Sequence, residues 1–355
     1  DLEANSRRLA SVEAHQMVSG LGASSIAALE IGNEPELYSH FGWYHTPSGH
    51  QVPGRPRDYN LADFESEFSS FTKAMPRVSL AGPSTGSPTW IAQLGQFLAR
   101  EPKVRIATVH AYPLKHCADS SHVTIGQLLA SSSSDGLAAQ IAPVATVAQR
   151  HHVPLRIDEL GSVTCGGQPG VSDTYATALW SLDTLFALAN AGVDGVNVHT
   201  PPRSTNQMFT VSQVNGTWQV YVHPNYYGLL MFAQATPPGS RLVRVSGSAA
   251  AGVSTWATRG TDGKTRVVVI NKSTSRPRPV TIKAPAAATT ATMELMRAPS
   301  ITAKTGITIG GQGFGAQTST GELAGTAQIP TLKQVRHAYR FKLPPASAAL
   351  VTISR

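Results

Sequence analysis

Two acidic residues that lie far apart in the chain each stand at the end of an apolar stretch, a setting in which carboxyl groups do chemistry. Glu34 follows the stretch Ile26–Ile31, and Pro35 prevents that strand from continuing. Pro35 also predicts an extended backbone at Glu34, so that the carboxyl group projects from a strand end. Strand ends carry the catalytic groups of parallel α/β barrels, and Asn33-Glu34-Pro35 is typical of a proton donor in sugar hydrolysis. A turn with a solvated Glu is the alternative for this tripeptide alone.

Glu159 supplies the second carboxyl group that such chemistry requires, at the end of the stretch Leu155–Glu159. Side chains alternate along a strand, so Glu159 is expected on the face of Ile157, with Asp158 on the opposite face. Only one of the two acids then points into a site. Two carboxyl groups that meet across the mouth of a barrel at ~5–5.5 Å suit a double displacement that retains anomeric configuration. Two surface acids at a loop start are the alternative.

The elements that carry these acids alternate between helix and strand. Helices are expected over residues 2–20, 62–74, 89–100, 136–150, 172–190 and 226–234. Strands are expected over residues 26–33, 78–81, 104–110, 155–159 and 195–199. Repeated βα units with short links predict a parallel sheet, and the long loops after the strands favour an α/β barrel of the TIM type.

Five strands do not close an eight-stranded barrel, so about three βα units, or about 90 residues, are expected to be absent from the front. Either a separate N-terminal companion chain supplies them after processing, or the sequence is truncated. Residues 1–240 are therefore interpreted as about five of eight βα units of a (β/α)8 barrel. Because the chain is expected to start inside a domain, the lack of an apolar leader at its start says little.

The rear of the chain, residues 241–355, differs in composition from residues 1–240. Short β-rich runs separated by Gly, Pro, Ser and Thr predict an antiparallel β-sandwich. The net charge of +8 is concentrated there: residues 1–240 hold 13 Lys and Arg against 18 Asp and Glu, whereas residues 241–355 hold 16 against 3. This break marks a domain boundary near Arg241, and the basic rear would attract polyanions. A solvated basic surface without a partner is the alternative.

Three runs of the sequence, in this order and at barrel spacing, resemble glycoside hydrolase family 79. They are Gly32-Asn33-Glu34-Pro35, Thr108-Val109-His110-Ala111-Tyr112, and the run from Asp158 to Thr174 that contains Glu159, Cys165, Gly166 and Gly167. The family includes β-glucuronidases and heparanases, all of them retaining enzymes, and the likeness covers roughly residues 5–240. The resemblance implies a glycosidase that cleaves β-linked glucuronic acid from glucuronides or from anionic polysaccharides.

The resemblance also implies roles for single residues. Glu34 resembles the acid/base, Glu159 the nucleophile, and Asn33 the amide that binds the sugar 2-hydroxyl. Tyr112 resembles the tyrosine that hydrogen-bonds the nucleophile. Gly166 and Gly167 resemble the glycines whose backbone amides receive the uronate carboxylate. The Gly-Asn-Tyr stretch with which the heparanase branch also grips the carboxylate is replaced here by residues 205–209, Thr-Asn-Gln-Met-Phe.

Further candidates each have a structural alternative. His110 shares a strand face with Tyr112 and orients a carboxylate or the sugar ring, or it is a buried structural His. Trp43, after Glu34, forms a sugar-stacking platform or packs within its loop. Cys117 and Cys165 follow neighbouring strands, so a disulfide is expected, which fits a secreted or extracytoplasmic enzyme, and two free thiols are the alternative.

Two rival functions come from other features. Gly82-Pro83-Ser84-Thr85-Gly86 matches the G-x-S-x-G elbow of serine esterases, with Ser84 as nucleophile and His199 or His223 downstream. The other rival function is that of a truncated barrel that binds anionic glycan through its basic rear without turnover. No stretch of about 18 apolar residues, no zinc-finger or helix-turn-helix pattern and no metal-ligand spacing occurs, so membrane insertion, nucleic-acid binding, metals and cofactors are not expected.

Overall fold

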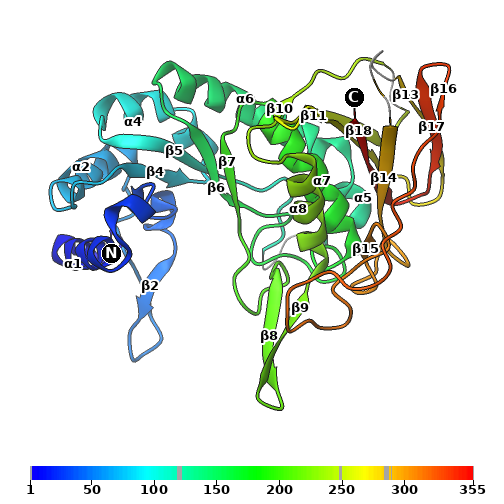
Figure 1. The fold of residues 1–355 in the computed structure, drawn as a ribbon. Helices are drawn as coiled ribbons and strands as arrows, with labels where there is room; N and C mark the ends of the chain where they lie inside the picture. The colour runs from blue at the N-terminus through cyan, green and yellow to red at the C-terminus, as the bar shows by residue number, and fades with distance from the viewer. Residues whose placement is uncertain (1, 118–121, 248–249, 284–287, 289, 355) are drawn as a thin grey trace. The chain divides into compact units, whose positions relative to one another are not determined.

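The computed structural model describes residues 2–117, 122–247, 250–283, 288 and 290–354. The chain divides by packing into two compact units (Figure 1). Unit 1 comprises Asp1–Ala111, Ala139–Leu160 and Ala191–Val198, and unit 2 comprises Tyr112–Ala138, Gly161–Asn190 and His199–Arg355. This division interleaves along the chain, whereas the charge pattern puts one break near Arg241. The boundary between residues 1–240 and 241–355 stays a prediction.

Unit 1 is built on an open sheet of five parallel strands, as the alternating sequence pattern predicts. The strands are β1 (Leu29–Glu30), β4 (Leu80–Thr85), β5 (Val104–Ala111), β6 (Leu155–Leu160) and β7 (Gly195–Val198). Their spatial order is β1-β4-β5-β6-β7, and each neighbouring pair is parallel. The carboxyl ends of all five strands therefore meet at one edge of the sheet, where Glu34 and Glu159 follow or end their strands.

Helices cover this sheet through aromatic side chains. The helices of unit 1 are α1 (Arg7–Leu21), α2 (Leu61–Thr72), α3 (Pro88–Ile91) and α4 (Leu94–Arg100), with most of α6 (Asp135–Arg150). Phe64 and Phe68 of α2 are fully buried and contact Phe97 of α4. Gly82 on β4 lies under them, because a Cβ there would meet Phe68 and Phe97 at 3.0 and 3.2 Å. The expected helix over residues 89–100 is two helices.

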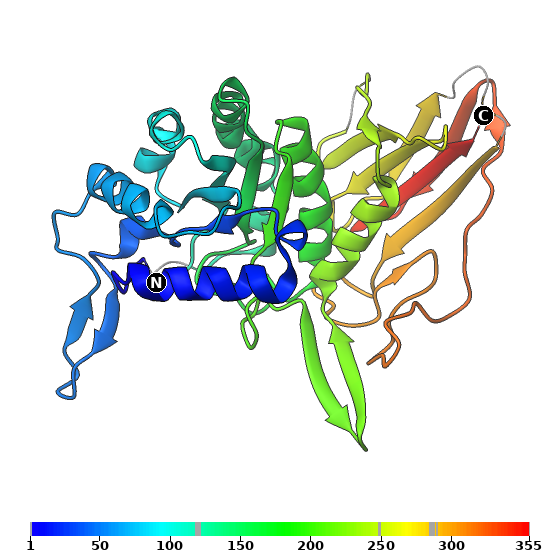
Figure 2. The ribbon, with the colours of Figure 1, turned by 60° about the vertical axis from the view of Figure 1, so that its left-hand side comes forward.

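Two elements differ from the sequence expectation. The expected strand over residues 26–33 is reduced to Leu29–Glu30, because Gly32 turns the chain with a φ of 90°. A two-stranded hairpin, β2 (Gly42–His45) and β3 (Gln51–Pro53), follows in the loop after Glu34. It extends away from the five-stranded sheet of its own unit (Figures 1 and 2).

Unit 2 contains the expected antiparallel sandwich. One sheet has the order β10-β11-β12-β18-β14-β15 and the other β13-β17-β16. Their bounds are β10 (Arg241–Leu242), β11 (Val253–Arg259), β12 (Thr265–Asn271), β13 (Arg278–Lys283), β14 (Thr290–Arg297), β15 (Thr308–Ile309), β16 (Gln334–Val335), β17 (Ala338–Leu343) and β18 (Ser347–Ser354). Buried side chains from both sheets, among them Val269, Tyr339 and Val351, form one apolar core between them.

The remaining elements of unit 2 are helices and a second hairpin. They are α5 (Ile125–Leu128), α7 (Tyr175–Asn190), α8 (Pro224–Ala235), β8 (Phe209–Val214) and β9 (Thr217–Val222), and short 3-10 turns lie at Ala23–Ser25 in unit 1 and Ser131–Ser133 in unit 2. Asp183 of the buried helix α7 forms an ion pair with Lys272 at the end of β12, with Nζ 2.8 Å from Oδ2. The helices of the described chain are too short or too polar to cross a membrane.

Candidate active site

Glu34 stands in a left-handed backbone conformation just after the first strand of the sheet. Its φ and ψ are 44° and 55°, so the prediction of an extended backbone is wrong. Pro35–Leu37 forms a 3-10 turn, η2, and the Glu34 N–H donates to the carbonyl of Ser84 on β4 at 2.8 Å. Non-glycine residues adopt this conformation at an energetic cost, and such strained residues are enriched at functional sites.

Asp158 and Glu159 are neighbours on β6, and both reach the same imidazole. Nε2 of His110 lies 3.3 Å from Asp158 Oδ2, and Nδ1 lies 3.7 Å from Glu159 Oε2. The prediction that only one of the two acids points into the site is therefore wrong. The register of β6 shifts against β5 at His110 and against β7 between Ile157 and Leu160, and such irregularities break strict alternation.

Glu34 and Glu159, which the sequence pairs, lie close together in space. An oxygen of each lies within 4.8 Å of the other, together with His110 Nδ1. Nδ1 is 2.9 Å from Glu34 Oε1. The side chains of Glu34 and Glu159 are 30% and 17% exposed, whereas that of His110 is 2% exposed. Both carboxyl groups are thus accessible, and the imidazole that joins them is buried.

His110 carries a positive charge in this setting. Burial alone disfavours a charged ring, but hydrogen bonds to Asp158 and Glu34, with the charges of Asp158 and Glu159, outweigh it and raise the pKa of His110 to about 10. At neutral pH both ring nitrogens are therefore donors. Nδ1–H donates to Glu34, and Nε2–H faces Asp158.

Glu30 on β1 has Asp158 as the partner that the sequence does not reveal. The residue as a whole is exposed, but its carboxyl group is crowded against β5 and β6. Desolvation there, followed by the negative charge of Asp158, raises the pKa of Glu30 to about 7, against the effect of a hydrogen bond from Thr108. Glu30 and Asp158 thus form a second pair of carboxyl groups beside the first.

A metal ion is the other occupant that this cluster permits by geometry. Within the described part of the chain, Glu34, His110 and Glu159 bring one ligand atom each close enough to hold an ion. An imidazolium has no lone pair for a cation and repels it. We therefore assign no metal to these residues.

Gly86 and Glu36 complete the surroundings of Glu34, a position that the sequence analysis gives to neither residue. The Gly86 N–H donates to Glu36 Oε1 at 2.6 Å. A Cβ at Gly86 would lie 3.3 Å from Glu34 Oε1. Burial raises the pKa of Glu36. The signal that could have found them is position, because Gly86 directly follows β4 and Glu36 directly follows the Asn-Glu-Pro tripeptide.

The chain is similar to known proteins in sequence and in fold. No protein-family model matches the chain. A human protein named inactive heparanase-2 is 32% identical over 176 residues, which are 48% of this chain and 28% of that protein. A β-glucuronidase of Neurospora crassa is 25% identical over 251 residues, which are 62% of this chain and 42% of that protein. The chain spans less than half the length of these relatives.

Solved structures show the same fold. A 4-O-α-L-rhamnosyl-β-D-glucuronidase from Fusarium oxysporum 12S superposes with a TM-score of 0.75 at 18% identity, over 99% of this chain and 75% of that one. A family 51 arabinofuranosidase from Xanthomonas axonopodis pv. citri superposes with a TM-score of 0.66 at 13% identity, over 100% of this chain and 74% of that one. The predicted barrel-type fold with a sandwich is confirmed.

The chain is similar in sequence to a heparanase-2 and to a β-glucuronidase, and in this sense it is family 79-like. The predicted resemblance is thereby confirmed, and the coarse class that it implies is a glycoside hydrolase fold. The roles of single residues stay predictions.

Ser84 does not have the setting of an esterase nucleophile. It lies within β4, is fully buried, and donates its hydroxyl to Asp158 Oδ2 at 2.7 Å. His110 Nε2 is 3.2 Å from the Ser84 hydroxyl, which imitates a Ser-His pair. A protonated imidazole is no base, however, and a nucleophile must reach substrate. The geometry therefore favours the glycosidase hypothesis for this family 79-like chain over the esterase hypothesis.

Tyr112 begins the part of the chain that belongs to unit 2. Its hydroxyl lies 2.8 Å from His199 Nδ1, and its ring covers Gly161, where a Cβ would overlap the ring carbons. The lack of a side chain at Gly161 thus leaves space for the Tyr112 ring. The hydrogen bond from Tyr112 to Glu159 that the resemblance implies stays a prediction.

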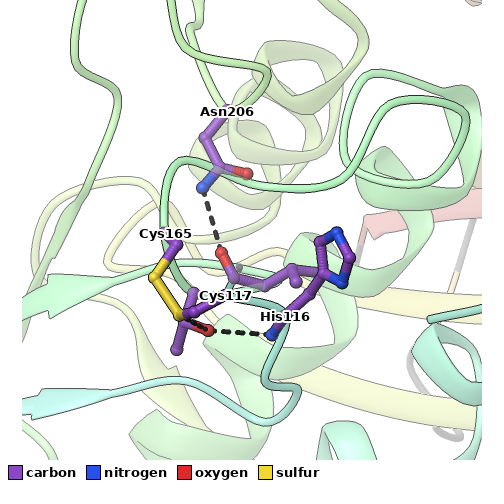
Figure 3. The surroundings of a disulfide bond; sticks show 6 residues. His116, Cys117, Cys165 and Asn206 are labelled. Carbon is purple, nitrogen blue, oxygen red and sulfur yellow. Dashed lines mark hydrogen bonds between the residues drawn. A yellow bond between two sulfur atoms is a disulfide. The ribbon is translucent and has the colours of Figure 1, made fainter. Parts of the chain in front are cut away.

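Gly166 and Gly167 lie in a tight turn of the family 79-like loop after β6, with φ values of 82° and 91°. The Gly167 N–H already donates to the Thr164 carbonyl at 3.2 Å, and the Gly166 carbonyl accepts from Asn206 at 3.0 Å. Asn206 also donates through its side chain to the Val163 carbonyl (Figure 3). Asn206 therefore holds this loop in shape, and the Gly166 N–H is the better remaining candidate for an anion.

Cys117 and Cys165 form the disulfide that the sequence predicts, with Cα atoms 5.5 Å apart (Figure 3). Thr164 lies beside the bond, and its hydroxyl accepts from the His116 N–H at 3.0 Å. The disulfide thus fastens the segment after β5 to the loop that carries Gly166 and Gly167.

Asn33 and Trp43 are both accessible. Asn33 is exposed, and its backbone N–H donates to the Tyr38 hydroxyl at 3.1 Å. Trp43 is 48% exposed on the hairpin of β2 and β3. Contact with a sugar stays a prediction for both residues.

Proposed function

We propose that this protein is a retaining glycoside hydrolase that cleaves β-linked glucuronic acid from glucuronides or from glycosaminoglycan-like glycans. One observation carries the proposal: oxygens of Glu34 and Glu159 lie within 4.8 Å of each other at the strand ends of a barrel-type sheet. Carboxyl groups of retaining enzymes are ~5–5.5 Å apart, whereas inverting enzymes leave room for a water at ~6.5–9.5 Å. The β-glucuronidase relative supports the choice of sugar.

The reaction follows from the two positions. Glu159 attacks the anomeric carbon while Glu34 gives its proton to the leaving oxygen, which produces a glycosyl-enzyme ester. Glu34 then takes a proton from water, and that water attacks the same carbon and releases Glu159. The mechanism needs a protonated Glu34 and an ionised Glu159 at the outset. Asn33 binds the 2-hydroxyl and Tyr112 supports the nucleophile in this proposal.

Recognition of the substrate carboxylate belongs to the same proposal. The Gly166 N–H receives the uronate, and Trp43 and His110 line the neighbourhood of the sugar. The Cys117–Cys165 disulfide supports secretion or another extracytoplasmic location.

The test uses the purified chain together with any chain that copurifies with it, which an intact-mass measurement identifies. Nitrophenyl β-D-glucuronide should release nitrophenol, and proton NMR of the first product should show the β-anomer. A 2-fluoro glucuronide with an activated leaving group should leave one sugar residue on Glu159, found by peptide mass. An α-anomer as first product, or label on another residue, contradicts the proposal.

Variants separate the two acids. Glu159→Ala should abolish turnover of every substrate. Glu34→Ala should spare substrates whose aryl leaving group needs no proton and should lose the others by about 10²–10⁴-fold, the usual size of general acid catalysis. An equal loss for both classes of leaving group contradicts the assignment of Glu34.

A catalytically incomplete module that binds anionic glycan is the second candidate. The name of the relative inactive heparanase-2 favours it, and so does a basic surface on the sandwich. Lys283 on β13 and Arg340 and Lys342 on β17 are exposed on the outer side of the three-stranded sheet. Retention on immobilised heparin without any glucuronidase activity would favour this candidate, and Lys283→Glu with Arg340→Glu should then abolish retention.

A further inference from the structure

Glu36 joins the two segments of chain that surround Glu34. The Glu34 N–H donates to the Ser84 carbonyl at 2.8 Å, and the Gly86 N–H donates to Glu36 Oε1 at 2.6 Å. The turn η2 is therefore tied to the end of β4 twice, once through the backbone and once through a side chain. The second bond is short, as bonds from an N–H to a carboxylate are. Glu36 thus fixes Gly86 against the turn that carries Glu34.

The position of Gly86 matters because its backbone lies beside the Glu34 carboxyl group. A Cβ at Gly86 would lie 3.3 Å from Glu34 Oε1 and 3.6 Å from Glu36 Oε1. Nδ1 of His110 contacts the same Glu34 oxygen at 2.9 Å. The backbone of Gly86 and the His110 ring therefore both restrict where Glu34 Oε1 can lie.

We propose that Glu36 is a positioning residue for the acid/base. Its carboxylate holds the Gly86 N–H, and through Gly86 and the turn η2 it keeps Glu34 directed at the leaving oxygen. Glu36 touches no substrate and transfers no proton. This inference rests on the proposed function, in which Glu34 is the acid/base, and it names the group that maintains the orientation of Glu34.

Two features of this arrangement are unfavourable by themselves, so a specific contact has to maintain it. Glu34 is in a left-handed conformation with a φ of 44°, and such strain persists only where the surrounding structure holds it. Burial raises the pKa of Glu36, and Glu36 Oε2 is buried without a hydrogen-bond partner among the described residues. An acid in an ordinary surface turn would keep both oxygens in water. Glu36 instead loses the solvation of one oxygen while the other binds the Gly86 N–H.

The experiment compares Glu36→Ala with Glu36→Gln, because the glutamine amide oxygen accepts the same hydrogen bond without the charge. Glu36→Ala should lower kcat by about tenfold to a hundredfold for leaving groups that need a proton, since catalytic geometry tolerates little displacement. Activated aryl leaving groups should lose much less, and KM should change little. Glu36→Gln should recover most of the loss.

Glu101→Ala is the matched control for removal of a buried carboxyl group. Glu101 is 5% exposed, its pKa is raised by burial, and it accepts a hydrogen bond from Ser69. It lies before the start of β5, at the opposite edge of the sheet from Glu34. Glu101→Ala should lower stability and leave both kcat and the dependence on the leaving group unchanged.

Hydrogen exchange of the Gly86 N–H, followed by NMR, measures the bond and requires no turnover. Gly86 is exposed, so its N–H should exchange slowly only while Glu36 accepts from it. Exchange should be about tenfold or more faster in Glu36→Ala than in the wild type, in line with the strength of a hydrogen bond to a charged group, and Glu36→Gln should restore most of the protection.

Three results overturn the inference: fast exchange of the Gly86 N–H in the wild type, equal losses of kcat in Glu36→Ala and Glu36→Gln, or an equal loss for both classes of leaving group. If the wild type hydrolyses no glucuronide, the proposed function fails instead. The exchange of the Gly86 N–H then still decides whether Glu36 holds this loop.

Discussion

The lack of a side chain at Gly86 leaves space for the Glu34 carboxyl group, because a Cβ at Gly86 would lie 3.3 Å from Glu34 Oε1. Gly86→Ala should therefore displace the proposed acid/base by a few tenths of an ångström and lower kcat by about tenfold to a hundredfold, because catalytic geometry tolerates little displacement. The measurement is glucuronidase activity with a substrate whose leaving group needs protonation. Gly20→Ala on α1 is the control, since a Cβ at Gly20 meets nothing within 4 Å. An equal loss in both variants contradicts the steric argument.

His110 should make stability depend on pH in a defined window. Its pKa is raised from 6.5 to about 10 on folding, so the folded state holds the proton more tightly than the unfolded state. The contribution is fully present below pH 6.5 and is lost as the pH rises toward 10. Denaturant unfolding at pH 6, 8 and 10 should show this loss in the wild type, and it should be much smaller in His110→Gln. Parallel pH dependences of the two proteins contradict the prediction.

The ion pair of Asp183 and Lys272 should be sensitive to loss of one partner. Asp183 is fully buried, and besides Lys272 it accepts from Ser134, Ser254 and Trp256. Lys272→Met leaves the buried carboxylate without its cation and should lower the free energy of unfolding by ~3–5 kcal/mol. Thermal or denaturant unfolding measures this loss.

A more exposed pair in the same unit is the control for that prediction. Lys304 pairs with Asp173, and the Lys304 side chain is 55% exposed. Lys304→Met should cost only ~0–1 kcal/mol, because water screens a surface pair. Similar losses at Lys272 and Lys304 would show that burial does not decide the strength of these pairs.

The Cys117–Cys165 disulfide spans 48 positions of sequence. A bond across a loop of this length should contribute ~4 kcal/mol by restricting the unfolded chain. Cys117→Ser and Cys165→Ser should each lower the unfolding free energy by a similar amount, and the double variant should lose no more than either single one. Additive losses would mean that the two residues act separately.

The sequence alone determined the βα alternation, the five parallel strands and the pairing of Glu34 with Glu159. These follow from local apolar periods and from Pro and Gly punctuation, which act over a few residues and are legible along the chain. The sequence also identified the two partners of the disulfide, because only two Cys residues are present.

Only the tertiary structure decided how the site is arranged in detail. Irregular registers turn Asp158 toward His110 together with Glu159, and the turn at Pro35 puts Glu34 in a left-handed conformation. The charge of His110, the pairing of Glu30 with Asp158 and the burial of Ser84 arise from residues on different strands. Such properties depend on distances across the sheet, and a period of two along a single strand carries no information about them.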